Sequence, residues 1–117
     1  VLFRSWRACR RRRRGPEMRA LLPTEVVSAL VHCPGWRLHG EGDQIAIEKH
    51  WQFESHVQAM LFVNSLGWLA ERMNHHPEVL LQYRQCTVRW RTHDVGGLSR
   101  LDFDAAAQTD ALPGVPA

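Results

Sequence analysis

Cysteines are few in this sequence, and none of them belongs to a pairing motif. Cys9, Cys33 and Cys86 form an odd, widely spaced set without a C-x-x-C pair, so neither a disulfide framework nor a thiolate zinc site is indicated. No apolar run approaches the roughly 18 residues that cross a bilayer, and no internal repeat is visible. With 117 residues and 44% hydrophobic content, we expect one domain in a reducing cytoplasm, without a membrane span.

Basic residues are scarce outside the beginning of the chain. Residues 1–17 hold seven arginines against the single acid Glu17, whereas residues 18–117 hold eight basic and eleven acidic side chains, a balance of −3. An arginine run can serve as a nucleic-acid or nuclear-localisation arm. Because the chain begins without Met and a domain-like pattern starts directly after Met18, we instead expect a disordered or non-native tail at 1–17 and a single domain at 18–117. No apolar segment follows the arginines, so a signal peptide is not indicated.

The first half of the domain reads as a short helix followed by two strands. Residues 22–25 open the helix with Thr24 as the candidate N-cap. Its apolar face is expected from four residues, Val26, Val27, Leu30 and Val31. Residues 36–39 form a short strand, and residues 45–53 alternate with period 2, with Lys49 as the exception on the apolar face. We expect these two strands to pair as a hairpin.

The second half begins with a long helix. Ser55 and Gln58 have capping-box spacing, and an apolar stripe predicts a helix to about Met73. The apolar arc is wider than one sheet contact requires. It is extended by Val57, Met60, Leu61 and Trp68. This width hints at contact with another subunit, although a well-covered core helix would give the same pattern.

Two more strands and a last helix complete the pattern. Strands are expected at 79–83 and 86–92, and Ser99-x-x-Asp102 is a capping box for a helix to about Asp110. The order is helix, two strands, helix, two strands, helix. It predicts an α+β two-layer sandwich, with a four-stranded antiparallel sheet and helices on one face.

Three histidines, His75, His76 and His93, follow the long helix and the last strand. Histidine titrates near neutral pH, so such a set suits proton transfer. Glu71 lies one helical turn before His75 and could orient an imidazole. Adjacent side chains point in different directions, and a zinc site on a helix would prefer i, i+4 spacing, so we expect no metal. The alternative is that Glu71 is a solvated helix residue and that the histidines cluster by chance.

The pattern around these histidines resembles that of the pterin-4a-carbinolamine dehydratase family. Family members carry a charged residue, three intervening residues, His-His-Pro, then an aromatic residue, a further histidine and a downstream aspartate. The chain meets each position, with Glu71, His75, His76, Pro77, Tyr83, His93 and Asp102. The likeness covers about residues 20–110, including the flanking segments. Leu81-Gln82-Tyr83 departs from the Asn-Val-Tyr-like segment that is common in the family.

The resemblance implies dehydration of 4a-hydroxytetrahydropterin to quinonoid dihydropterin, a step of tetrahydrobiopterin recycling downstream of an aromatic amino-acid hydroxylase. The step needs an acid and a base, and no metal or redox cofactor. By resemblance, His75 and His93 are the acid/base pair and His76 binds and polarises the substrate. The supporting residues implied are Glu71, Trp36, Pro77, Asp94 and Asp102, with Trp36 lining the pterin pocket. For Asp102 we expect a structural role first, because it is the capping-box acid.

A second function stays open beside the enzyme. Relatives of this fold act as dimerisation cofactors of a homeodomain transcription factor or in assembly, so the chain could be a non-catalytic protein-binding module. The presence of all three histidines favours catalysis. The acidic domain lacks a recognition signature, so we do not expect nucleic-acid binding. Family members are dimers or tetramers, and the resemblance therefore implies a homo-oligomer.

Overall fold

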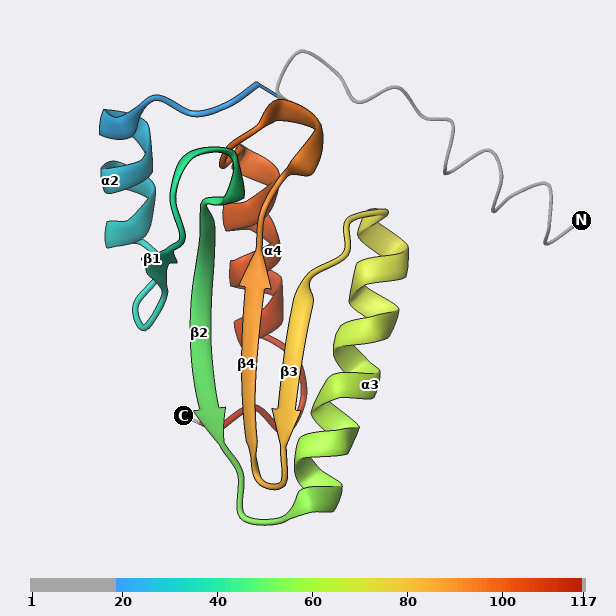
Figure 1. The fold of residues 1–117 in the computed structure, drawn as a ribbon. Helices are drawn as coiled ribbons and strands as arrows, with labels where there is room; N and C mark the ends of the chain where they lie inside the picture. Colours follow the sequence, from blue (N-terminus) through green and yellow to red (C-terminus); the bar gives the residue numbers. More distant parts are fainter. Residues whose placement is uncertain (1–18, 117) are drawn as a thin grey trace, which may run out of the picture.

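Helices and pairs of strands alternate along the computed structural model, which describes residues 19–116 (Figure 1). The order is α2 (Pro23–Val31), β1 (Arg37–His39), β2 (Ala46–Gln52), α3 (His56–Met73), β3 (Glu78–Gln82), β4 (Gln85–Trp90) and α4 (Arg100–Asp110). The predicted order of elements is therefore confirmed. The arginine-rich segment 1–17, and with it the predicted boundary at residue 18, lies outside the described residues.

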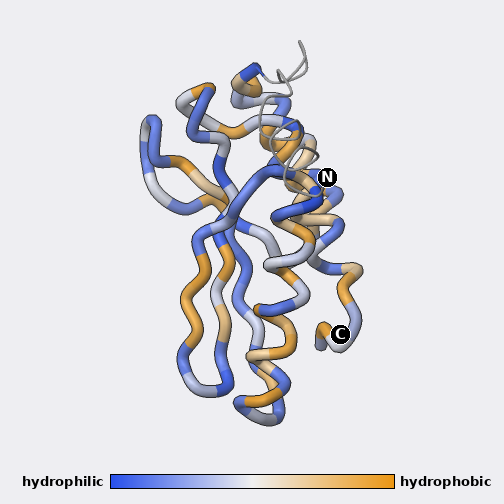
Figure 2. The backbone as a smooth tube through the Cα atoms, turned by 90° about the vertical axis from the view of Figure 1, so that its right-hand side faces the viewer, coloured by the Kyte–Doolittle hydropathy of each residue, from blue (hydrophilic) through white to orange (hydrophobic). Residues whose placement is uncertain are grey.

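The strands form one antiparallel sheet in the order β1-β2-β4-β3. β2 and β4 are central, and their register pairs Ile47 with Trp90 and Trp51 with Cys86. Figure 2 shows the helices on one side of the sheet, while the other side is open. This arrangement confirms the predicted two-layer α+β sandwich. None of the helices within residues 19–116 combines the length and the apolar character that a bilayer crossing requires.

The core fills the space between the sheet and the helices. Its members include Ile47 and Trp51 from β2, Trp90 from β4, and Phe62 and Leu66 from α3. Alternate strand residues point to the helical layer, which explains why these side chains meet. Burial of a large apolar side chain contributes about 1.5–3 kcal/mol, so this cluster stabilises the contact between the sheet and the helices.

Lys49, the exception in the alternation of β2, stays on the apolar side and finds partners there. Its ammonium group lies 5.3 Å from the ring centroid of Trp51 and pairs with the carboxylate of Asp110 at 2.7 Å. The long aliphatic stem covers apolar surface while the charge reaches the edge of the core. Asp110, at the end of α4, thereby ties that helix to β2.

Several element boundaries differ from those predicted by one or two residues. Helix α2 begins at Pro23 with Leu22 as its N-cap, so the prediction of Thr24 was wrong. Proline has no N–H to satisfy at the first helical position, and Glu25 Oε1 accepts the backbone N–H of Leu22 at 3.0 Å. Val26 is buried as expected, whereas Val27 and Val31, predicted on the buried face, are exposed in this chain. The last two strands each start one residue earlier than predicted.

Candidate active site

The end of α3 places His75 at the start of the site. Asn74 adopts the left-handed conformation, with φ 50° and ψ 42°, which asparagine tolerates better than most residues. The backbone N–H of His75 then donates to the carbonyl oxygen of Ala70 at 3.1 Å. Pro77 prevents the helix from continuing, and β3 begins at the next residue. His75 follows this turn directly and its side chain is buried.

His75 is held in the interior by a carboxylate and by an aromatic ring. Its side chain is 5% exposed, and its Nε2 lies 2.7 Å from Oδ1 of Asp102, which is 0% exposed. The imidazole stacks on Trp90, with the ring centroids 5.2 Å apart and an interplanar angle of 22°. A buried carboxylate requires hydrogen-bonding or charged partners. The hydrogen-bonded pair of His75 and Asp102 is therefore part of the buried core and not a chance contact at the surface.

Asp102 has two structural tasks at once. As the third residue of α4 it completes the predicted capping box, because Oδ2 accepts the backbone N–H of Ser99 at 3.0 Å. The same oxygen accepts the hydroxyl of Thr92 at 2.8 Å, and the hydroxyls of Thr92 and Ser99 are 2.6 Å apart. All of these side chains are buried. One carboxylate thus joins the start of α4, the end of β4 and His75.

His93 lies next to this network along the chain. It directly follows Thr92, which bonds Asp102, and opens a 3-10 turn at His93–Val95. Thr92 and Gly97 form an isolated antiparallel bridge, and Gly96 closes the loop with φ 65°. His93 and Asp94 are both exposed. The fold therefore offers one buried imidazole and one accessible imidazole at the same end of the sheet.

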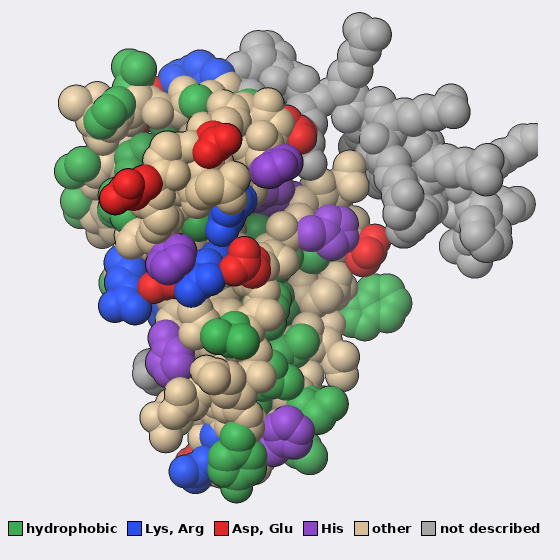
Figure 3. Space-filling view, in the orientation of Figure 1, with side chains coloured by type: hydrophobic (Ala, Val, Ile, Leu, Met, Phe, Trp, Pro, Cys, Tyr) green, Lys and Arg blue, Asp and Glu red, His purple; other side chains and the backbone are tan. Residues whose placement is uncertain are grey.

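His76 is exposed, unlike His75, and pairs with Glu71. Its Nε2 lies 3.2 Å from Oε1 of Glu71, five residues back in the chain, and both side chains are about half exposed. The predicted proximity of Glu71 to the histidines is thus found at His76. Figure 3 shows several histidine side chains, in purple, together in the upper part of one face, near the ends of α3 and β4. The three predicted histidines belong to these adjoining chain segments.

Two residues of the sequence pattern lie elsewhere. Trp36 donates its indole N–H to Asp110 at 2.9 Å and packs edge-on against Trp51. Asp110 is eight residues beyond Asp102 on α4, about 12 Å along the helix axis at 1.5 Å per residue. Tyr83 lies at the turn between β3 and β4, 70% exposed and stacked on His56. The partners of Trp36 are thus Asp110 and Trp51, and that of Tyr83 is His56.

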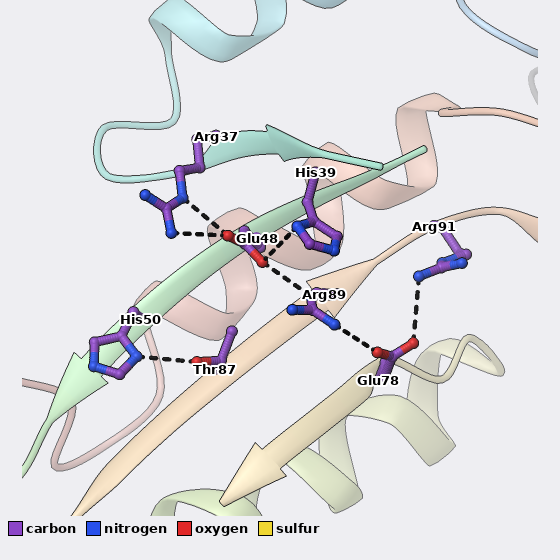
Figure 4. A network of polar contacts seen from close by, with 8 residues as sticks. All are labelled: Arg37, His39, Glu48, His50, Glu78, Thr87, Arg89 and Arg91. Carbon is purple, nitrogen blue, oxygen red and sulfur yellow. Dashed lines mark hydrogen bonds and ion pairs between the residues drawn. The ribbon is translucent and has the colours of Figure 1, made fainter. Parts of the chain in front are cut away.

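A row of charged residues crosses the open face of the sheet beside the site (Figure 4). The register aligns Arg37, Glu48, Arg89 and Glu78 across all four strands. Arg89 bonds Glu48 at 2.9 Å and Glu78 at 2.8 Å, and Arg91 reaches Glu78 at 3.3 Å. Burial acts to raise the pKa of Glu48, but hydrogen bonds from Arg89 and Arg37 outweigh it and hold the pKa below its usual range.

The charged residues of this row link the strands next to which the histidines lie. Glu78 is two residues after His76, and Arg91 is two residues before His93. The Arg91–Glu78 pair therefore links the chain segments on which these two histidines lie. No cluster of three potential metal ligands occurs among residues 19–116.

Sequence reasoning did not single out Thr92 and Trp90 as parts of the site. The signal was present, because Trp90 and Thr92 continue the buried alternation of β4. A threonine expected on a buried face needs a hydrogen-bond partner. An acid at the capping position of the next helix is a natural acceptor. That combination would have pointed to the contact between Thr92 and Asp102.

Comparison with known sequences gives a consistent result. The sequence model of the family described as "Pterin 4 alpha carbinolamine dehydratase" matches residues 19–112. A protein of Paracidovorax citrulli is 44% identical over 94 residues, which cover 80% of this chain and 81% of the relative. A protein of Stenotrophomonas maltophilia is 45% identical over 87 residues, covering 74% and 73%. Both relatives carry the family's name as a provisional assignment.

Solved structures agree with the sequence comparison. A "transcriptional coactivator/pterin dehydratase" of Brucella melitensis superposes with a TM-score of 0.73 at 28% identity, covering 79% of this chain and 96% of that one. A pterin dehydratase-like protein described as a RuBisCO assembly factor of the alpha-carboxysome shares the fold, with a TM-score of 0.58 at 24% identity over 73% of this chain and 96% of that one. By its family match and its close relatives, the chain belongs to the pterin-4α-carbinolamine dehydratase family.

Proposed function

We propose that the chain dehydrates 4a-hydroxytetrahydropterin to quinonoid dihydropterin by general acid/base catalysis. The bond between carbon 4a and the hydroxyl oxygen breaks, and the oxygen leaves as water with a proton from the acid. The base removes the proton on ring nitrogen 5, and its electron pair forms the new C=N bond. The reaction has no net oxidation or reduction, so two proton-transfer groups and a means of holding the ring suffice.

The observation that carries this proposal is the buried His75–Asp102 pair beside an exposed histidine. A carboxylate that accepts from one imidazole nitrogen leaves the other nitrogen for proton transfer. His75 and His93 are assigned the acid and base roles, and His76, exposed and paired with Glu71, binds and polarises the substrate. Pro77 fixes the turn that carries both neighbouring histidines. Asp94, in the same 3-10 turn as His93, is assigned a supporting role.

The test is dehydration of freshly generated 4a-hydroxytetrahydropterin, followed by ultraviolet absorbance. The parent should exceed the spontaneous rate, and His75→Ala and His93→Ala should each lose one to several orders of magnitude in kcat, about what general acid/base catalysis contributes. His56→Ala is the matched control, since His56 stacks on Tyr83 at the opposite end of the sheet. A folded parent no faster than the spontaneous reaction would overturn the assignment.

A second candidate function is a protein-binding module, and one observation favours it. The outer face of α3 exposes four large apolar side chains, Val57, Met60, Leu61 and Trp68. Beside it, a groove of about 660 Å³ runs between α3 and residues 113–116, with Leu61 and Phe62 in its wall. Exposed apolar patches mark interaction surfaces. The Brucella melitensis neighbour, named both a coactivator and a dehydratase, is a precedent for two roles in one fold.

The same apolar face supports a homo-oligomer, dimer or tetramer, built on α3. Trp68 is 74% exposed and Leu61 59%, and burying each Å² of such surface contributes about 25 cal/mol. We assign the protein to the cytoplasm, in recycling of tetrahydropterin released by an aromatic amino-acid hydroxylase. Free, buried Cys33 and Cys86 fit a reducing compartment.

A further inference from the structure

We propose that Thr92 and Ser99 are positioning residues that act through Asp102 on His75. Together they fix the imidazole with its proton on Nε2, so that Nδ1 is the nitrogen that exchanges a proton with the substrate. The catalytic consequence rests on the proposed dehydration. The tautomer of His75 itself can be measured whether or not the chain is a dehydratase.

The direction of the hydrogen bonds follows from the donors available. Thr92 donates its hydroxyl proton to Oδ2 of Asp102. That proton cannot also serve the contact between the two hydroxyls, so Ser99 Oγ–H donates to Thr92 Oγ at 2.6 Å. The backbone N–H of Ser99 is a second donor to Oδ2. The chain of bonds therefore runs one way, from Ser99 through Thr92 to Asp102.

The direction of these hydrogen bonds determines which nitrogen of His75 carries the proton. An ionised carboxylate only accepts hydrogen bonds. Oδ2 already has two donors, and the remaining oxygen, Oδ1, faces Nε2 of His75 at 2.7 Å. Nε2 must then carry a proton in the neutral imidazole, which leaves Nδ1 with the lone pair. Removing the Thr92 donor would let the carboxylate turn and would weaken the preference.

Burial protects this arrangement from exchange with water. Thr92, Ser99 and Asp102 are exposed by 1% or less, so no bulk solvent competes for their donors. The stack of His75 on Trp90 restrains rotation of the ring. In a low-dielectric interior a fully satisfied network specifies a single arrangement, while a partly satisfied one does not. Asp102 is the residue that bonds the imidazole, and the two hydroxyls are linked to it through that carboxylate, so they are positioning residues rather than catalytic ones.

The experiment uses Thr92→Val, which keeps the shape of the side chain and removes the donor. Thr92→Ser should restore the donor, and Thr87→Val is the matched control, since Thr87 lies on β4, whose end is two residues before Thr92, and bonds His50 at 2.9 Å on the open face of the sheet. Imidazole nitrogens of ¹⁵N-histidine-labelled protein are observed by NMR, and His75 is assigned from the spectrum of His75→Gln. The steady-state kinetics of dehydration are measured in parallel.

In the parent and in Thr87→Val we expect neutral His75 to be protonated on Nε2 only. Thr92→Val should populate the second tautomer and lower kcat about tenfold with little change in KM, and Thr92→Ser should restore both. A folded Thr92→Val with parental tautomer and kcat would overturn the proposal. If that variant does not fold, Ser99→Ala is measured instead, and a parental tautomer and kcat in Ser99→Ala would overturn the proposal. If the parent has no dehydratase activity, the proposed function fails while the tautomer result still decides this inference.

Discussion

Asp102→Asn keeps the shape of the side chain but removes its negative charge and replaces one acceptor oxygen with a donor NH₂ group. Asp102 accepts hydrogen bonds from His75 at 2.7 Å, Thr92 at 2.8 Å and Ser99 at 3.0 Å. An asparagine oxygen can still accept from Thr92 and Ser99. Its amide nitrogen then faces Nε2 of His75 and donates to it, which forces the imidazole proton onto Nδ1. The variant should fold with the wrong tautomer in place.

The expected magnitudes differ for stability and for rate. Hydrogen bonds to a charged group contribute about 1.5–3 kcal/mol and neutral ones about 0.5–1.5 kcal/mol. Two bonds weaken by about 1 kcal/mol each, and the absence of a buried charge offsets part of the loss, so Asp102→Asn should cost about 1–2 kcal/mol in unfolding free energy. Inverting a tautomer fixed by a carboxylate can cost as much as about 10⁴ in kcat. We expect a loss of at least about 10² here.

Urea unfolding and the dehydration assay measure these two quantities. Asp102→Ala is the comparison, because it leaves the Thr92 hydroxyl and the Ser99 N–H without their acceptor and should cost about 3–5 kcal/mol. The reasoning is refuted if Asp102→Asn is folded and retains parental kcat. It is equally refuted if Asp102→Ala is as stable as Asp102→Asn.

Four further predictions follow from other parts of the molecule. The depressed pKa of Glu48 means that its contribution to stability is fully present above the unfolded value of about 4.3 and is lost as pH falls through the folded value. Glu48→Gln should therefore lower the free energy of unfolding by about 2 kcal/mol at pH 7. Its urea midpoint should also fall less steeply than that of the parent as the pH is lowered, and an equally steep fall in both proteins would contradict the role of Glu48. Burial raises the pKa of the Cys86 thiol to about 11, so peptide mapping at pH 8 should find it alkylated only in denaturant; rapid native labelling would be inconsistent with its burial. Trp68→Glu should dissociate the proposed homo-oligomer in sedimentation experiments without unfolding the chain, and an unchanged sedimentation coefficient would contradict an interface on α3. Trp36→Phe loses the hydrogen bond to Asp110 and should cost about 1 kcal/mol with unchanged pterin KM, while a raised KM would place this ring in the pocket.

Elements with a strong periodic pattern could be read from the sequence. The 18 residues of α3 begin after Ser55 as expected, because Ser55 Oγ accepts the N–H of Gln58. The capping box of Ser99 and Asp102 was also predicted and is confirmed. Shorter signals were less reliable. At α2, Thr24 is a favourable N-cap residue, and Pro23 is favourable at the first helical position. The helix follows the second signal and begins at Pro23.

The contacts of the candidate site depend on tertiary structure, which local patterns do not contain. Spacing suggested that Glu71 would orient His75, because the two lie four residues apart. The left-handed turn at Asn74 changes the direction of the chain, so Glu71 contacts His76 instead and His75 meets Asp102. Trp36 bonds Asp110 and Tyr83 stacks on His56, and these partners come from distant parts of the chain that a sequence motif does not reveal.

The double role of Asp102 makes the first turn of α4 a reporter on His75. Fraying of this turn would break the Ser99 N–H bond and the His75 bond in the same opening event, since one carboxylate accepts both. Local openings of this kind have their own free energies, which amide hydrogen exchange records residue by residue. The hydrogen-exchange rate of the Ser99 backbone amide would therefore report how often the hydrogen bond between His75 and Asp102 opens in the native protein, with no substrate present.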